Sequence, residues 1–141
     1  MPKTSTWDLW TLNLQLMMGI MVEVTPRVRE LRLEIKELFL LAEVDKHPSP
    51  ADLARVLCTP KPTVTFMVKR LEAASYLKRS AEPDDARRSR LTLTASGRRA
   101  MEGARAILDE AFGERLGRLS AAERAMLAEL LGKMADEGEA E

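Results

Sequence analysis

The chain has 141 residues, 45% of them hydrophobic, and its 22 Lys and Arg balance 22 Asp and Glu. This size suits one domain with a helical extension, and the apolar content excludes a disordered chain. With one cysteine and one histidine, the chain cannot form an intrachain disulfide, and a zinc site would need unusual ligands. We therefore expect a cytoplasmic protein without a cofactor or metal, because the N-terminus also lacks the pattern of a secretory signal.

The charges are unevenly distributed along the chain. Residues 1–45 hold 5 Lys and Arg against 7 Asp and Glu, residues 46–99 hold 12 against 5, and residues 100–141 hold 5 against 10. A basic middle between acidic ends favours contact of the middle with a polyanion. On charge alone, chance clustering on a solvated surface is an equal alternative.

The first predicted helix begins after Ser5, which has the spacing of a capping box with Asp8, and runs past Pro26 toward Leu31. Its segment 9–22, LWTLNLQLMMGIMV, is apolar on nearly every side. A helix without a polar face is buried all round, and so short a chain cannot easily enclose it. We therefore expect a second copy of the chain to cover it, and no membrane span, since 14 residues are too few.

Three shorter helices are predicted next. Residues 31–44 form an amphipathic helix, with Leu31, Ile35, Leu38 and Leu41–Ala42 on one side. After the break DKHPSP, Ser49 caps a helix over residues 50–58, and a further helix follows TPKP and ends at about Ala74. Two short helices joined by a tight turn predict a helix-turn-helix.

The second helix of this pair has one apolar and one basic face. Its buried stripe is predicted to contain Val64, Met67, Val68 and Leu71. On the opposite face and its flanks, threonine hydroxyls suit base edges and cations suit phosphates. Phe66 on that face would contact thymine methyl groups or pack on a neighbouring element. The candidate DNA-contacting residues of this helix are Lys61, Pro62, Thr63, Thr65, Phe66, Lys69 and Arg70.

A β-hairpin is predicted directly after this helix. YLKRS (76–80) and SRLTLT (89–94) alternate as strands do, and AEPDDARR (81–88) has the composition of a turn. An arginine on such a tip can enter a narrow minor groove, and Asp85, two residues before Arg87, could hold its guanidinium in place. The alternative is a surface ion pair worth ~0–1 kcal/mol. The candidate DNA-contacting residues of the hairpin are Lys78, Arg79, Arg87, Arg88 and Arg90.

Two helices close the chain. TASG (94–97) caps a long helix that ends at about Leu119, and SAAE (120–123) is a capping box for the last helix. The last helix carries Met126, Leu127, Leu130, Leu131 and Met134, and an acidic tail follows it.

The segments DLARVL (52–57), PTVTFMVKRLEAASYLKR (62–79) and DDARRSRLTLTASG (84–97) together resemble the MarR family of bacterial transcription regulators. The last segment is similar to the family's wing signature, with Asp85, Arg87, Leu93-Thr94 and Gly97 in the matching places. The resemblance implies a mainly α fold with a small β-hairpin wing, in which a winged helix-turn-helix is flanked by dimerisation helices. The implied divisions are a dimerisation helix (1–30), the DNA-binding domain (31–97) and C-terminal dimerisation helices with the tail (98–141).

The resemblance also implies a function. It predicts a homodimeric repressor that reads a pseudo-palindrome in double-stranded DNA, with the helix over 61–74 in the major groove. Arg87 would reach the minor groove, with Asp85 orienting it. Many family members bind small aromatic effectors, and Trp7, Trp10, Met17 and Met21 could line such a pocket, although dimer packing is the favoured role for an apolar stripe.

Three further expectations concern alternatives. Cys58 is expected to be a small buried filler rather than an oxidant sensor. The competing function is a winged-helix adaptor that docks an acidic protein through Phe66 and the basic face. An enzyme is not expected, because the chain has no Ser/His/Asp or Cys/His set, no phosphate-cradling glycine loop and no metal-ligand spacing.

Overall fold

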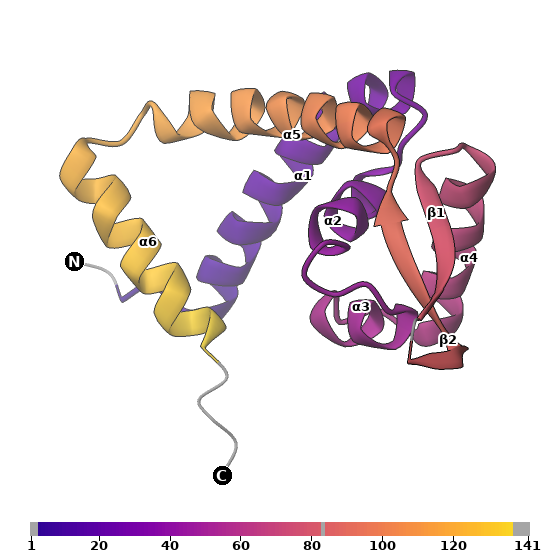
Figure 1. Ribbon diagram of the computed structural model, residues 1–141. Coiled ribbons are helices and arrows are strands. Elements are labelled where there is room, and N and C mark those ends of the chain that lie inside the picture. The colour runs from indigo at the N-terminus through magenta and orange to yellow at the C-terminus, as the bar shows by residue number, and fades with distance from the viewer. Residues whose placement is uncertain (1–2, 83, 137–141) are drawn as a thin grey trace, which may run out of the picture.

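The structure is a computed structural model that describes residues 3–82 and 84–136, with the side chains of residues 86–88 outside the described part. Its elements follow the predicted order, which confirms a mainly helical fold with a two-stranded hairpin (Figure 1). They are α1 (Thr6–Glu30), α2 (Ile35–Glu43), α3 (Pro50–Val56), α4 (Lys61–Ala73), β1 (Leu77–Glu82), β2 (Asp85–Leu93), α5 (Ala95–Leu116) and α6 (Ala121–Ala135).

The helices α2, α3 and α4 and the hairpin form one compact lobe, and α5 leaves this lobe across α1 (Figure 1). At the far end of α5 the chain turns back into α6 (Figure 1). The buried core lies where the C-terminal half of α1, α2, α4 and α5 meet, and it includes Val24, Leu41, Val68 and Ala104. The N-terminal half of α1 and all of α6 therefore extend beyond the core of the lobe.

The capping box of α1 forms as predicted. Ser5 Oγ accepts a hydrogen bond from the Asp8 backbone N–H at 3.1 Å, and the Asp8 carboxylate accepts one from the Ser5 N–H at 3.1 Å. The hydrogen bond from the Ser5 hydroxyl at 2.7 Å is the main reason why the pKa of Asp8 is lowered. The helix continues through Pro26 to Glu30, as the sequence predicts.

The helix α2 is shorter than the predicted helix over 31–44. Arg32 has a φ of 61°, in the left-handed region, so the chain turns between α1 and α2 instead of continuing as a helix. Leu33, on the α2 side of this turn, is buried in the core. The apolar spacing resembled a longer helix because the residues of the turn also pack on the core. Ala42, expected on the buried side, is exposed.

The helix pair α3–α4 agrees with the sequence in its caps and its buried stripe. Ser49 Oγ accepts from the Asp52 N–H at 3.2 Å, and Pro50 occupies the first turn of α3. On α4, the predicted stripe of Val64, Met67, Val68 and Leu71 is buried throughout. This stripe fixes the rotation of α4 about its axis and hence determines which residues face outward.

The hairpin is longer than predicted. β1 and β2 pair antiparallel from Leu77 opposite Leu93 to Ala81 opposite Ser89, and the register then shifts so that Glu82 lies opposite Asp85. Residues 85–88, whose composition predicts a turn, belong to β2. Residues 86–88 thus form an irregular part of the strand between two ladder partners.

The hairpin is tied to the start of α5 by a close backbone approach. Thr94 Oγ1 accepts from the Gly97 N–H at 2.9 Å and donates to the Ser75 carbonyl at 2.6 Å, as the predicted cap requires. A Cβ atom on Gly97 would lie 2.1 Å from the Tyr76 carbonyl oxygen. Only glycine therefore lets α5 begin so close to the root of the hairpin, which gives the Leu-Thr-x-x-Gly pattern a physical cause.

Two helical segments leave large apolar side chains exposed. In α1 they lie between residues 7 and 22, and in α6 every residue except Leu127 is exposed. The segment 9–22, expected to be buried all round, is therefore mostly exposed in the single chain, and Ile20 is the residue of it that is buried in the core. Among the helices that the structure describes, none has the length and apolar content of a membrane span. The most exposed of these side chains include Trp7, Leu9, Leu12, Met18, Met126 and Met134.

Candidate nucleic-acid interface

The outward face of α4 is exposed to solvent. Because the opposite stripe is buried, six of the seven residues predicted from this helix are exposed and form no ion pair with another described residue. Phe66 is 68% exposed and does not pack on a neighbouring element, so the second of its two predicted alternatives is wrong for the single chain. The six residues are Lys61, Pro62, Thr63, Thr65, Phe66 and Lys69.

The hydroxyl groups on this face differ in what they can still donate. Thr65 Oγ1 donates a hydrogen bond to the Lys61 carbonyl, one turn earlier, at 3.0 Å. That bond uses the only proton of the hydroxyl, although its oxygen can still accept. Thr63 has no such bond in the described part of the chain, so its hydroxyl can both donate and accept at the start of α4.

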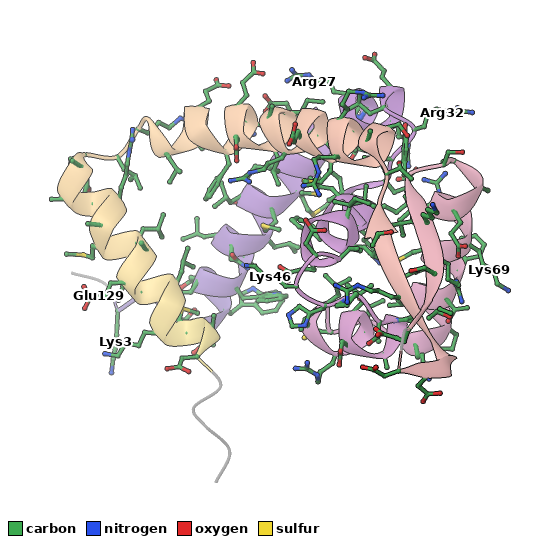
Figure 2. All side chains as sticks on the ribbon, in the orientation of Figure 1. Lys3, Arg27, Arg32, Lys46, Lys69 and Glu129 are labelled. Atoms are coloured by element: carbon green, nitrogen blue, oxygen red, sulfur yellow. The ribbon has the colours of Figure 1, made fainter. Side chains whose placement is uncertain are left out.

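Two exposed lysines add positive charge to the same face. Within residues 3–82 and 84–136, neither Lys61 nor Lys69 belongs to an ion pair closer than 4.0 Å, and Figure 2 shows Lys69 extending away from α4. Glu72, near the end of α4, is the one carboxylate of this helix; it is partly exposed and is paired with Arg79 at 2.9 Å. A basic face whose single neighbouring acid is already paired is suited to phosphate groups, which lysine binds as a point charge.

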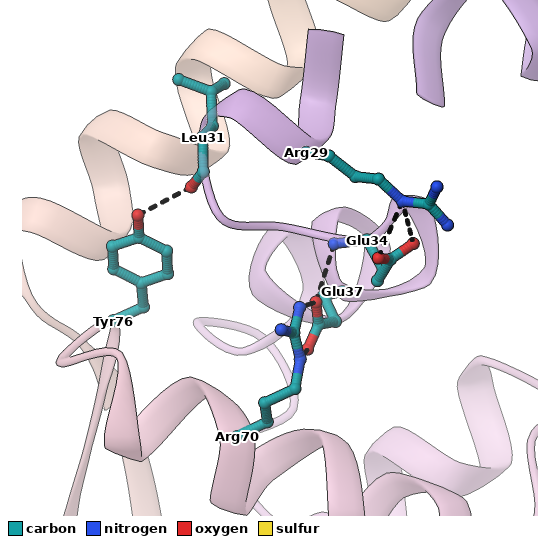
Figure 3. A network of polar contacts seen from close by, with 6 residues as sticks. All are labelled: Arg29, Leu31, Glu34, Glu37, Arg70 and Tyr76. Atoms are coloured by element: carbon teal, nitrogen blue, oxygen red, sulfur yellow. Dashed lines mark hydrogen bonds and ion pairs between the residues drawn. The ribbon is translucent and has the colours of Figure 1, made fainter. Parts of the chain in front are cut away.

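Arg70 differs from the prediction, which placed it among the phosphate contacts. Its Nε donates to Glu37 Oε2 at 2.7 Å and its Nη2 donates to Glu37 Oε1 (Figure 3). This bidentate hydrogen bonding raises the pKa of Arg70 above its ordinary value. Glu37 is only 2% exposed, so the guanidinium neutralises a buried carboxylate. In the single chain, Arg70 joins α4 to α2 instead of facing outward.

The same network reaches the end of α1. Glu37 Oε1 also accepts from the Glu34 N–H at 2.7 Å, and Glu34 in turn accepts from Arg29 Nε at 3.0 Å (Figure 3). The hydroxyl of Tyr76 donates to the Leu31 carbonyl at 2.7 Å. These contacts connect α1, the start of α2 and α4, and they fix the orientation of the helix that carries the exposed basic face.

The hairpin residues separate onto two faces. Because Ser80 lies opposite Arg90 and Lys78 opposite Thr92, these side chains share one face, while Leu77 and Leu91 are buried on the other. Lys78 and Arg90 are exposed, as expected for a basic outer surface. Arg79 lies on the inner face, where its Nη2 is 2.9 Å from Glu72 Oε1 of α4, although its side chain remains 40% exposed.

The predicted tip of the hairpin lies partly outside the described residues. The structure places Arg87 and Arg88 in β2, but their side chains are outside the described part, and so is the proposed contact between Arg87 and Asp85. Asp85 itself opens β2 and is exposed.

The predicted ligand-pocket residues do not enclose a cavity within the single chain. Trp7, Trp10 and Met17 are exposed, and Met21 packs partly buried against the core. A surface hollow of about 530 Å³ lies elsewhere, between the start of α3 and the hairpin, and a smaller one of about 300 Å³ lies between α2 and the α3–α4 turn. Any pocket formed by the four residues would require a second chain.

Cys58 is not the buried filler that the sequence suggested. It is exposed in the α3–α4 turn with a φ of 48°, because the chain reverses there. The neighbouring Thr59 donates from Oγ1 to the Leu57 carbonyl at 2.9 Å and does not cap α4. Across the described ranges, His, Cys, Asp and Glu side chains do not gather into a group of three or more that could hold a metal.

Sequence reasoning missed Glu37 as the partner of Arg70. A signal was present, because Glu37 follows Leu33 by four residues and precedes Leu40 and Val44 by three and seven, which places a carboxylate on a buried apolar stripe. A charge in such a place requires a partner. The pattern could identify the need for a cation but not which arginine supplies it.

Comparison with known proteins supports the same family. The model of the MarR family matches residues 33–89, which cover α2, α3, α4 and most of the hairpin. YdgJ, an HTH-type transcriptional regulator of Bacillus subtilis, is 30% identical over 116 residues, which are 82% of this chain and 69% of the relative.

Solved structures share the fold over nearly the whole chain. YusO of Bacillus subtilis is 26% identical, with a TM-score of 0.68 over 95% of this chain and 99% of that one. A complex of MepR from S. aureus with DNA has a TM-score of 0.79 at 20% identity, covering 96% and 100% of the two chains. A cysteine-to-serine mutant of E. coli MarR with operator DNA has a TM-score of 0.76 at 22% identity, covering 90% and 93%. The chain belongs to the MarR family of DNA-binding transcription regulators, which are not enzymes.

Proposed function

We propose that the chain is a homodimeric repressor that reads a pseudo-palindromic operator, with α4 in the major groove and the hairpin as a wing in the minor groove. The observation that carries this proposal is the outward face of α4, on which Lys61 and Lys69 flank exposed Thr63 and Phe66. The one carboxylate of the helix, Glu72, is paired with Arg79. The width of the major groove admits one α-helix, and phosphates line both of its edges. The DNA complexes of MepR and E. coli MarR, which share this fold, support the placement.

The dimer is proposed from the exposed apolar surface of α1 and α6. Tryptophan, leucine and methionine side chains on both helices lie in solvent in the single chain, and contiguous exposed apolar surface on this scale marks an interface. We assign residues 1–30 and 98–141 to dimerisation and residues 31–97 to DNA binding. A two-fold axis between two copies would present two α4 helices to half-sites about 34–36 Å apart, one turn of DNA.

The wing is assigned to the minor groove. Lys78 and Arg90 on the outer face of the hairpin would contact phosphates. Arg87 would enter the groove, with Arg88 on the adjacent backbone and Asp85 orienting the Arg87 guanidinium. Arg70 and Arg79, which are paired with Glu37 and Glu72, take structural roles in this proposal.

The proposal includes response to a small aromatic effector. Indole rings and thioethers give favourable contacts to aromatic rings, and Trp7, Trp10, Met17 and Met21 would line a pocket completed by the second chain. A thermal-shift screen with small aromatic acids tests this, with Trp10→Ala as the variant. An acid that raises the melting temperature of the wild type but not of the variant is expected, and equal shifts in both would contradict the pocket.

DNA binding is tested by selecting duplexes from a random pool with the purified chain and measuring their affinity at several salt concentrations. We expect an enriched pseudo-palindrome and an affinity that falls steeply with salt. Lys61→Ala and Lys69→Ala should each flatten the slope of log K against log salt by ~0.9 per protomer, or about 1.8 for the dimer.

Lys133→Ala, compared at a concentration at which it is still dimeric, provides the matched control, because Lys133 is an exposed lysine on α6, outside the proposed DNA interface. It makes the same change in net charge and should leave the slope unchanged. Failure to enrich any duplex would contradict the proposed function and favour the adaptor. Equal effects of all three substitutions would contradict the assignment of α4 to the groove.

A further inference from the structure

Phe66 is an unusual residue for the place it occupies. Outside the exposed apolar segments of α1 and α6, Phe39 and Phe66 are the large hydrophobic side chains that the described chain leaves exposed, at 44% and 68%. Phe39 lines the hollow between α2 and the α3–α4 turn, whereas Phe66 projects from the second turn of α4. A phenylalanine side chain this exposed buries little apolar surface within the chain, so the fold gains little stability from it. A contact that explains a phenylalanine at this position therefore lies outside the chain.

The neighbours of Phe66 limit the hydrogen bonding that this face can offer. Pro62, one turn earlier, has no N–H and an apolar ring. The hydroxyl proton of Thr65 is already donated to the Lys61 carbonyl. Within the first two turns, Thr63 is the remaining neutral donor on the exposed surface. The centre of the face therefore has apolar contacts to offer and few hydrogen bonds.

The major groove contains one prominent apolar group, the 5-methyl group of thymine. We propose that Phe66 is a specificity-determining residue that packs on a thymine methyl group in each half of the operator. This inference rests on the proposed function and specifies what the proposed site reads. Thymine at that position would be preferred over cytosine, which lacks the methyl group, by an apolar contact rather than by a hydrogen bond.

The charges around Phe66 favour DNA over a second copy of the chain as its partner. Lys61 and Lys69 lie on the same face, so pairing this face with itself would bring four ammonium groups together. The same two lysines are attracted to the phosphates that border a groove. The apolar surfaces suited to self-association lie on other helices, α1 and α6.

The test is a scan of the selected operator in which deoxyuridine replaces each thymine in turn, first in one half-site and then in both. This change removes the methyl group and leaves the hydrogen-bonding edge of the base unchanged. At one position, we expect the affinity of the wild type to fall about fourfold per half-site and about tenfold or more for both, from ~0.8 kcal/mol per buried methyl group. Phe66→Ala should bind the thymine and deoxyuridine operators equally.

Two further variants separate a lost contact from a damaged fold. Phe66→Leu keeps an apolar side chain and should retain part of the preference for thymine. Phe39→Ala removes the other exposed phenylalanine, which lies on α2, and should prefer thymine over deoxyuridine as strongly as the wild type does. The wild-type scan needs no variant, so it tests the inference even if Phe66→Ala does not fold.

The possible results have distinct meanings. A wild type that binds a specific operator but tolerates deoxyuridine at every position would overturn this inference and leave the proposed function standing. A preference for the thymine over the deoxyuridine operator that persists in Phe66→Ala would also overturn this inference, because another residue would then contact the methyl group. A selection that enriches no duplex would overturn both the proposed function and the inference.

Discussion

Replacing Arg70 with methionine should destabilise the protein by about 2–4 kcal/mol, because it leaves the buried carboxylate of Glu37 without its cation. Removing one partner of a fully buried pair costs ~3–5 kcal/mol, and we expect a lower value here since water reaches the Arg70 side chain, which is 44% exposed. The free energy of unfolding is measured by urea denaturation at a fixed protein concentration, followed by circular dichroism.

The neighbouring pair of Arg79 and Glu72 is the matched control. Its 2.9 Å contact also joins an arginine to a glutamate of the α4 region, but both side chains are partly exposed. Arg79→Met should therefore cost only ~0–1 kcal/mol. Glu37→Leu combined with Arg70→Met should restore part of the stability lost in either single variant, because an apolar pair leaves no unpaired charge. Equal costs for the two arginine variants, or additive costs in the double variant, would show that the buried Glu37 carboxylate does not depend on Arg70 for its stability.

The salt dependence of operator binding gives an independent test of the role of Arg70. If Arg70 orients α4 through Glu37, Arg70→Met should weaken binding without changing the slope of log K against log salt. If it contacts a phosphate, as its sequence position suggested, the slope should flatten by ~0.9 per protomer, as for Lys69→Ala.

Three further predictions follow from the packing and the helix caps. Gly97→Ala should lower the free energy of unfolding, measured by thermal denaturation, by at least about 2–3 kcal/mol, because its Cβ would lie 2.1 Å from a backbone carbonyl oxygen. Gly113→Ala, with open space around the new methyl group, should not lower it. The pKa of Glu123 is lowered because its carboxylate accepts a hydrogen bond from the Ser120 backbone N–H. The stabilisation of α6 by this carboxylate is therefore present above the ordinary pKa of glutamate and is lost as the pH falls through the lowered pKa. Glu123→Gln should abolish this acid-dependent loss of helical circular dichroism. Leu12→Asp, which places a charge in the exposed apolar surface of α1, should yield monomers in sedimentation velocity, and an unchanged dimer would contradict the assigned interface.

The features predicted well from sequence depend on residues close together in the chain. Capping boxes span four residues, and the boxes that begin at Ser5 and Ser120 both form. The stripe of α4 spans two turns and is buried as expected. In such cases helix geometry alone places the interacting groups, so a local pattern is sufficient.

The features missed depend on contacts between distant residues. Glu37 and Arg70 are separated by 33 positions, and nothing local to Arg70 distinguishes it from Lys69, which is free to face outward. Similarly, the need for glycine at Gly97 comes from the carbonyl of Tyr76, which only the folded hairpin brings close. The hairpin is longer than its composition predicts because Pro and Asp have low strand propensity, whereas ladder pairing decides the outcome.

Footprinting of the DNA sites occupied by this protein across the genome shows whether two α4 helices read an operator together. We expect protected sites with two inverted half-sites whose centres lie about 10–10.5 base pairs apart, because two α4 helices related by a two-fold axis enter successive turns of the major groove. The sites should lose protection when Lys61 and Lys69 are both replaced by alanine. Protection of single, unpaired half-sites, or no reproducible protection, would contradict this mode of DNA binding.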